Sequence, residues 1–174
     1  MYDCIIFDVD GTLIDTENVV FRAYQKVIYE EYGRYFTREE IAPAYGVPTR
    51  EALIILGFKN VDEASEKHQK YLLEFFSEVQ PFEGITKTLE FLYKNGVTMG
   101  VVTSRNKAET EKDPCFEKLM KYFNNNIVCS DDTKEHKPNP EPLLKAVEKT
   151  GVQKSKILYV GDTYYDYMCA KNAG

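Results

Sequence analysis

The sequence Asp8-Val9-Asp10-Gly11-Thr12 follows directly after the apolar run Cys4-Ile5-Ile6-Phe7. A short run of this kind is typical of a strand that is buried on both faces of a parallel sheet. Ligands of such sheets bind beyond the carboxyl ends of the strands. The pattern therefore favours a site that binds a metal ion and attacks phosphorus, although Asp-Gly pairs also occur in turns that only join two elements.

The overall composition is that of a globular protein and restricts the class of partner. The 174 residues are 43% hydrophobic and 29% charged, with a net charge of −6. This size allows a core with a small additional domain, and the acidic balance argues against a nucleic-acid partner. Neither a signal peptide nor a membrane span is expected, because the start of the chain lacks the required segments and no long apolar window follows. The predicted location is cytoplasmic.

The four cysteines are expected to be reduced and mostly buried thiols. They are widely separated without CxxC spacing, and the sequence has only two histidines, so a zinc site is not expected.

After the first strand, the pattern is helical until about residue 97. Gly33 is expected to end a helix whose face carries Val20, Tyr24, Val27 and Glu31, and residues 37–40 have the form of a capping box. Pro48 precedes another helix start, Leu72, Phe75 and Phe76 mark a further apolar stripe, and residues 80–84 form a return linker.

Strands and helices then alternate. Strands are predicted at 97–102, 127–129 and 157–160, and helices at 85–94, at 108–123 with a break near Pro114, at 141–150, and from Tyr164 onward. Such alternation is typical of right-handed βαβ units and a parallel sheet. The predicted fold class is therefore α/β.

Each predicted strand is followed by polar residues of the types that phosphoryl transfer requires. Because the carboxyl ends of parallel strands meet at one edge of the sheet, these residues are expected to form a single site. Besides the first pair of aspartates, they are Thr103, Ser104, Lys137, Asp162 and, one helical turn later, Asp166.

A cluster of carboxylates needs a counter-charge. Two carboxylates at about 4 Å repel each other by about 4 kcal/mol at an effective dielectric constant near 20. Mg²⁺ would remove the conflict, since it takes oxygen ligands and is commonly held by one or two carboxylates together with a substrate phosphate. Mg²⁺ is the predicted cofactor, with Asp162 as one of its anchors.

The remaining side chains can be assigned to steps of the chemistry. Asp8 is placed to attack phosphorus and form an aspartyl-phosphate, and Asp10 can protonate the leaving oxygen and later activate water. Thr103 or Ser104 can hydrogen-bond a phosphoryl oxygen, and Lys137 can neutralise the charge that develops there.

Simpler interpretations exist for each residue alone. The Thr103-Ser104 pair could cap a helix, Lys137 could be a solvated loop residue, Asp162 could cap the next helix and Asp166 could lie at the surface. They do not explain why all these residues follow strands on the same side.

Four segments of the chain together resemble the motifs of the haloacid dehalogenase-like hydrolase superfamily. They are Asp8–Leu13, Val101–Arg105, Lys137–Pro142 and Tyr159–Asp166. Within that superfamily, the chain is similar to the branch of phosphoglycolate phosphatases and β-phosphoglucomutases, which carry a helical cap between the first two motifs. The resemblance implies a Rossmann-like parallel sheet core in residues 1–14 and 81–174, with an inserted α-helical cap in residues 15–80.

The resemblance also implies roles for the acidic residues. Asp8 would be the nucleophile and Asp10 the acid and base, and an acid at this second position argues against dehalogenation. Mg²⁺ would be held by Asp8, the backbone carbonyl of Asp10 and Asp162, with Asp166 as a ligand or a nearby partner. Arg50 matches a cap arginine that binds the distal phosphate of the substrate in the mutases. Alternatively, it is a surface residue paired with Glu51 or Glu39.

Family members usually continue past the position of Gly174 into another strand. The chain is therefore expected to be either a fragment or a protein with a shortened sheet, whose last helix has a partly exposed apolar side.

The predicted function is that of a Mg²⁺-dependent phosphatase acting on a small phosphorylated metabolite. A phosphomutase of the β-phosphoglucomutase type would use the same residues, and a receiver-like phosphorylatable signalling module is a third, remote possibility. The sequence specifies neither the substrate nor the oligomeric state.

Overall fold

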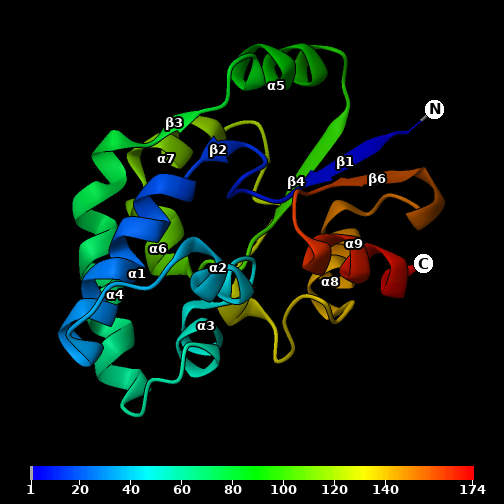
Figure 1. The fold of residues 1–174 in the computed structure, drawn as a ribbon. Coiled ribbons are helices and arrows are strands. Elements are labelled where there is room, and N and C mark those ends of the chain that lie inside the picture. Colours follow the sequence, from blue (N-terminus) through cyan, green and yellow to red (C-terminus); the bar gives the residue numbers. More distant parts are fainter. Residues whose placement is uncertain (1) are drawn as a thin grey trace.

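A four-stranded parallel sheet forms the centre of the protein in the computed structural model, which describes residues 2–174 (Figure 1). Its strands are β1 (Cys4–Phe7), β4 (Thr98–Val102), β5 (Ile127–Val128) and β6 (Ile157–Val160), in the order β5-β4-β1-β6. Phe7 lies beside Val101 and Val160, so the strands end at nearly the same level. This register brings the segments after β1, β4 and β6 to one edge of the sheet.

Both faces of the sheet are covered, which explains why its strands are apolar on both sides. Ile6 points into a core shared with α8 (Glu141–Thr150) and α9 (Tyr164–Ala173). Phe7, the next residue, points into a second core that includes residues of α5 (Ile85–Lys94) and α7 (Pro114–Met120). The alternation follows from the two-residue period of a strand. The α/β fold expected from the sequence is confirmed.

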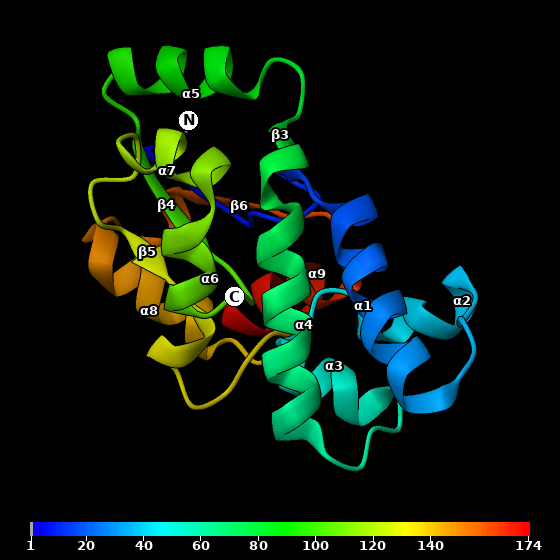
Figure 2. The ribbon, with the colours of Figure 1, turned by 90° about the vertical axis from the view of Figure 1, so that its left-hand side faces the viewer.

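Residues 16–79 contain four α-helices, which we call the helical insert: α1 (Glu17–Tyr32), α2 (Arg38–Ile41), α3 (Thr49–Ile55) and α4 (Val61–Phe75). Figure 2 shows α1 and α4 packed side by side, and α3 lies against α4. Gly33 ends α1 with a φ of 66°, and Thr37 and Glu40 form the predicted capping box. The insert has an apolar cluster of its own, which includes Ile28, Ile41 and Leu53.

Two very short strands join the insert to the sheet. β2 (Ile14–Asp15) pairs antiparallel with β3 (Gln80–Pro81), so the two crossings of the chain lie next to each other. This pair was not predicted, because two residues are too few to show a period. The helix predicted at 108–123 is divided into α6 (Lys107–Lys112) and α7, and Asp113 caps α7 by accepting hydrogen bonds from the backbone N–H groups of Cys115 and Phe116.

The helix face predicted from Val20 to Glu31 is correct only in part. Tyr24 and Val27 are buried, whereas Glu31 is exposed near the end of α1. Short 3-10 turns complete the fold: η1 (Ala42–Ala44), η2 (Phe76–Glu78), η3 (Ser130–Asp132) and η4 (Lys154–Lys156). Within residues 2–174, every helix is too short or too polar to cross a lipid bilayer.

Candidate active site

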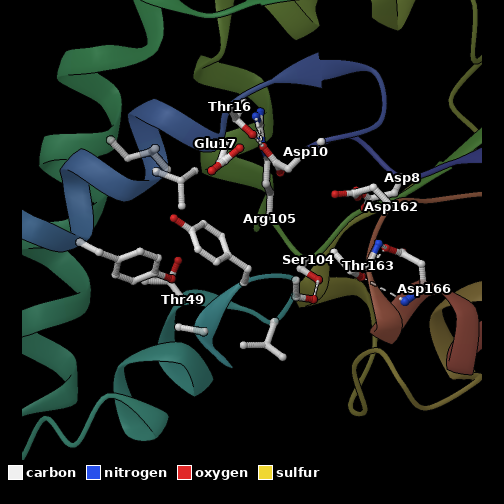
Figure 3. A pocket seen from close by; sticks show the side chains of 18 of the residues that line it. Asp8, Asp10, Thr16, Glu17, Thr49, Ser104, Arg105, Asp162, Thr163 and Asp166 are labelled. Atoms are coloured by element: carbon white, nitrogen blue, oxygen red, sulfur yellow. Dashed lines mark hydrogen bonds and ion pairs between the residues drawn. The ribbon is translucent and has the colours of Figure 1, made fainter. Parts of the chain in front are cut away.

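A cavity of about 620 Å³ lies between the carboxyl ends of the strands and the helical insert. Asp8 reaches it from the end of β1, Ser104 from the end of β4 and Asp162 from the end of β6 (Figure 3). Lys137 reaches it from the loop that precedes α8. Polar residues from distant parts of the sequence therefore meet at one edge of the sheet, as the strand pattern predicted.

Lys137 forms the centre of a buried group of charges. Its Nζ atom donates to Oδ1 of Asp8 at 2.6 Å and to Oδ1 of Asp166 at 2.7 Å, and the lysine is only 3% exposed. Burial opposes the charge of the lysine, but the two carboxylates outweigh it and raise the pKa of Lys137 well above its usual value. A permanent positive charge therefore lies beside the carboxylate of Asp8.

Asp8 is buried and has unusual acid-base properties. Burial, together with repulsion from Asp166 and Asp10, raises its pKa to about 7 in spite of the attraction of Lys137. One carboxylate oxygen accepts the hydrogen bond of Lys137, and among residues 2–174 the other accepts none. That second oxygen is the atom available to attack an electrophile or to bind a cation.

Asp10 is held by Arg105, a residue for which the sequence predicts no role. Nε and an Nη atom of Arg105 donate to its two carboxylate oxygens at 2.8 and 2.7 Å, and Thr16 adds a third hydrogen bond of 2.7 Å. The other Nη atom of Arg105 donates to Asp113 at 2.7 Å. Burial disfavours the charge of Asp10, but Arg105 outweighs it and lowers the pKa of this carboxyl. In this arrangement Asp10 is ionised, and both of its carboxylate oxygens accept hydrogen bonds.

Asp166 has little capacity left for a metal ion. Its Oδ1 accepts from Lys137 and from the hydroxyl of Tyr159 at 2.7 Å, and its Oδ2 accepts from the backbone N–H and the hydroxyl of Thr163. Burial raises the cost of its charge, but these donors outweigh that cost and lower the pKa of Asp166. Its position is that of a residue that orients Lys137 and caps α9.

Asp162 is the exposed carboxylate of the site. Partial burial and repulsion from Asp166 raise its pKa, and it accepts only a long hydrogen bond of 3.3 Å from Thr12. Gly11 allows this close approach of the two strand ends. A Cβ atom at that position would lie 2.2 Å from an oxygen of Asp162, and the φ of Gly11 is +77°, where a side chain is strained.

The donor set fits a hard divalent cation. Carboxylate oxygens of Asp8, Asp162 and Asp166 lie within 4.8 Å of one another, and burial, together with repulsion between these carboxylates, raises the pKa values of Asp8 and Asp162. Oxygen ligands of this kind are those that Mg²⁺ takes. Because Asp166 is saturated by its own donors, Asp8 and Asp162 are the residues best placed to hold the ion. The side chain of Asp10 faces Arg105, so only its backbone carbonyl could contribute.

The Thr-Ser pair after β4 is divided between two environments. Thr103 is 3% exposed, and its hydroxyl accepts a hydrogen bond from the backbone N–H of Arg105. Ser104 lines the cavity and donates to the carbonyl of Gly46, at 2.9 Å, in the helical insert. Ser104 is therefore the member of the pair that contacts both the cavity and the insert.

The structure does not bring Arg50 to the other predicted site residues. This side chain is 61% exposed on α3 and forms an ion pair with Asp62, not with Glu51 or Glu39. Its neighbour Thr49 lines the cavity instead.

The cavity is also lined by residues of the helical insert and of α6 that no motif indicated. Tyr24, Tyr45, His68 and Glu109 line it. No sequence pattern indicates their role, because Tyr24, His68 and Glu109 lie within helices and Tyr45 in a turn, and they meet only when the insert packs over the sheet. Arg105 differs, since its place directly after Thr103-Ser104 could have suggested a partner for the strand-end carboxylates.

Comparisons with known proteins identify the family. The model of the haloacid dehalogenase-like hydrolases matches residues 5–174. Pyrophosphatase PpaX of Bacillus velezensis is 32% identical over 171 residues, which cover 98% of this chain and 79% of that protein.

Solved structures agree in fold. A candidate phosphoglycolate phosphatase from Lactobacillus plantarum is 26% identical, with a TM-score of 0.89 over 99% of this chain and 83% of its own. A candidate β-phosphoglucomutase from Thermotoga maritima is 30% identical, with a TM-score of 0.75 over 98% of this chain and 81% of its own. The chain therefore belongs to the family of haloacid dehalogenase-like hydrolases and is an enzyme of the phosphatase type.

Proposed function

We propose that this hydrolase is a Mg²⁺-dependent phosphatase that cleaves a small phosphorylated metabolite through an aspartyl-phosphate on Asp8. The observation that carries the proposal is the contact of Lys137 with Asp8 at 2.6 Å, at the end of β1 and within a cavity that also contains Asp162. A nucleophile, a cation for the phosphoryl oxygens and an acidic pair for a metal ion are thus within reach of one phosphate group. Membership of the hydrolases argues against the receiver-like alternative.

In the first step, the free oxygen of Asp8 attacks phosphorus while the bond from phosphorus to the leaving oxygen breaks. Lys137 remains charged and can stabilise the phosphoryl oxygens as negative charge builds up on them, and Ser104 can donate a hydrogen bond there once its hydroxyl leaves the carbonyl of Gly46. A bound Mg²⁺, held by Asp8 and Asp162, would supply further positive charge at the same oxygens.

We propose that Asp10 is the general acid of the first step and the general base of the second. To protonate the leaving oxygen, its carboxyl must move away from Arg105, because that pair keeps Asp10 ionised. In the second step, the Asp10 carboxylate takes a proton from water, the water oxygen attacks phosphorus, and the bond to Asp8 breaks. Inorganic phosphate is released and Asp8 is regenerated.

We further propose that residues 15–80 act as a cap on the core formed by residues 1–14 and 81–174. The pairing of β2 with β3 at both crossings and the separate apolar cluster of the insert support this division. Ser104 donates a hydrogen bond to Gly46 of the insert, so a movement of the cap would change the position of Ser104 in the site. The four free, buried cysteines support a cytoplasmic location, where thiols stay reduced.

The test measures phosphate release by the purified chain from p-nitrophenyl phosphate, sugar phosphates, phosphoglycolate, nucleotides and pyrophosphate. Activity is expected with Mg²⁺, none with excess chelator, and none in Asp8→Asn, whose amide is a poor nucleophile. A labelled phosphoryl group should be trapped on the wild type and not on the variant. Wild-type activity in Asp8→Asn would contradict the mechanism, and full activity in chelator would exclude the metal.

A phosphomutase is the second candidate. The resemblance to the Thermotoga maritima protein favours it, because 30% identity extends over 98% of this chain. A mutase would convert a sugar phosphate into its isomer without net release of phosphate. Nuclear magnetic resonance of phosphorus in the same reactions would separate the two activities.

A further inference from the structure

The end of the cavity that faces the helical insert differs in its lining from the end that contains Asp8, Lys137 and Asp162, which we call the phosphoryl end. Figure 3 shows Thr49 and Glu17 across the cavity from Asp162 and Asp166. Apart from the exposed ion pair of Glu17 with Arg38, apolar and aromatic side chains with a few neutral polar groups line this part, which we call the insert end. Its lining includes Val20, Tyr24, Tyr45, Val47, Thr49, His68 and Leu72.

Every cation that lines the cavity is already paired with carboxylates. Lys137 is shared by Asp8 and Asp166. Arg105 is shared by Asp10 and Asp113, and Arg38 forms an ion pair with Glu17. Among residues 2–174, therefore, no unpaired lysine or arginine lines the cavity to receive a second phosphate or a carboxylate of the substrate.

Glu109 adds a carboxyl group without an ion-pair partner among the described residues; burial raises its pKa, and the attraction of Arg105 offsets only part of that effect. The side chain lies on α6, lines the cavity and is only 4% exposed. Its Oε2 accepts a hydrogen bond of 3.0 Å from the backbone N–H of Asn106, and it takes part in no ion pair within the described chain. A buried carboxylate without a cation repels another anion strongly, since little solvent screens it.

We propose that Glu109 is a specificity-determining residue that excludes a second anionic group from the insert end, so that the enzyme selects monophosphates of neutral, hydroxyl-bearing molecules such as sugars. The inference rests on the proposed phosphatase function and deepens it. The charge pattern carries it: paired cations around the phosphoryl end, and an unpaired carboxylate together with neutral groups beyond it.

Neutral hydrogen-bonding groups at the insert end agree with such a substrate. The hydroxyl of Tyr45 and both ring nitrogens of His68 are buried without a hydrogen-bond partner among the described residues. Burial lowers the pKa of His68 to about 3, so the ring stays neutral and offers no charge to an anion. His68 also stacks on Tyr24, with ring centroids 4.3 Å apart. Rings and neutral polar groups of this kind suit the apolar face and the hydroxyls of a sugar.

The test compares Glu109→Gln with Glu111→Gln. Glutamine can still accept the hydrogen bond that caps α6, so the first variant removes the charge and keeps the capping interaction. Glu111 lies two residues further along the same helix and is exposed, which makes it the matched control. Phosphate release is measured with fructose 6-phosphate and fructose 1,6-bisphosphate, which differ by one phosphate.

The wild type is expected to prefer the monophosphate in kcat/KM. Glu109→Gln should raise kcat/KM for the bisphosphate by about tenfold, the size expected from removing one charge in a weakly screened site, and change the monophosphate little. Glu111→Gln should leave both values as in the wild type. An unchanged ratio in Glu109→Gln, or a wild-type preference for the bisphosphate, would overturn the inference.

A binding measurement separates this inference from the proposed function. The shift in melting temperature caused by each sugar phosphate is measured in the presence of chelator, where no turnover is expected. In the wild type, the monophosphate should cause a larger shift than the bisphosphate, and this difference between the two ligands should disappear in Glu109→Gln. That result would support the selectivity even if no phosphate were released and the phosphatase proposal failed. Equal shifts in wild type and Glu109→Gln, or no shift with either ligand, would refute the selectivity while leaving phosphatase activity on other esters intact.

Discussion

Acid should destabilise this protein through His68, and His68→Leu should remove that effect. The imidazole is 1% exposed in α4, and neither ring nitrogen has a hydrogen-bond partner within the described residues. Burial lowers its pKa from 6.5 to about 3. Below about pH 6.5 the unfolded chain therefore binds a proton that the folded chain does not bind, and the free energy of unfolding falls as the pH falls.

The magnitude follows from the two pKa values. One proton contributes about 1.36 kcal/mol per pH unit between the two values. Between pH 7 and pH 5 the unfolded chain becomes almost fully protonated at this residue while the folded chain stays neutral, which costs about 2 kcal/mol. The loss continues toward pH 3, where folded His68 begins to take up a proton. Between pH 7 and pH 8 His68 contributes almost nothing.

Urea unfolding at pH 5, 7 and 8 measures the effect in wild type and variant. Leucine has about the volume of histidine and needs no hydrogen bond, so His68→Leu should be at least as stable as wild type at pH 7. Its loss of stability from pH 7 to pH 5 should be smaller than that of the wild type by about 2 kcal/mol. Equal losses in the two proteins would show that the folded state protonates His68 readily, and the reasoning would fail.

Three further substitutions test the site. Gly11→Ala should lower the free energy of unfolding by about 1–2 kcal/mol, because the φ of Gly11 is +77°. It should also raise the Mg²⁺ concentration needed for activity, since the new Cβ displaces Asp162. An unchanged Mg²⁺ titration would contradict this second effect. Arg105→Ala should lower the free energy of unfolding by about 3–5 kcal/mol, because Asp10 and Asp113 lose their buried partner; urea unfolding measures it, and a negligible loss would show that the pair is weak. Arg50→Ala should leave the rates on monophosphates and bisphosphates equal to those of the wild type, because Arg50 is exposed and paired with Asp62 outside the cavity. A selective loss on bisphosphates would restore Arg50 as a phosphate-binding residue.

Local patterns in the sequence were sufficient for the secondary structure that forms the core. The strand Ile157–Val160 and the helix Glu141–Thr150 have the predicted bounds, because strand alternation, helix caps and the stop at Gly151 are properties of adjacent residues. The same local logic failed for β2 and β3, which consist of two residues each. Their pairing depends on contact between residues far apart in the chain.

The sequence by itself determined which chemical groups gather at the sheet edge, because a parallel sheet brings the residues after its strands together wherever they lie in the chain. Only the tertiary structure decided how those groups are paired. Asp10 binds Arg105, 95 residues away, and Arg50 turns to Asp62 at the surface. Glu109 and His68 become part of the cavity because the insert packs over the sheet. Ion pairing and burial depend on distances between side chains of separate elements, and periodicity along the chain carries no information about those distances.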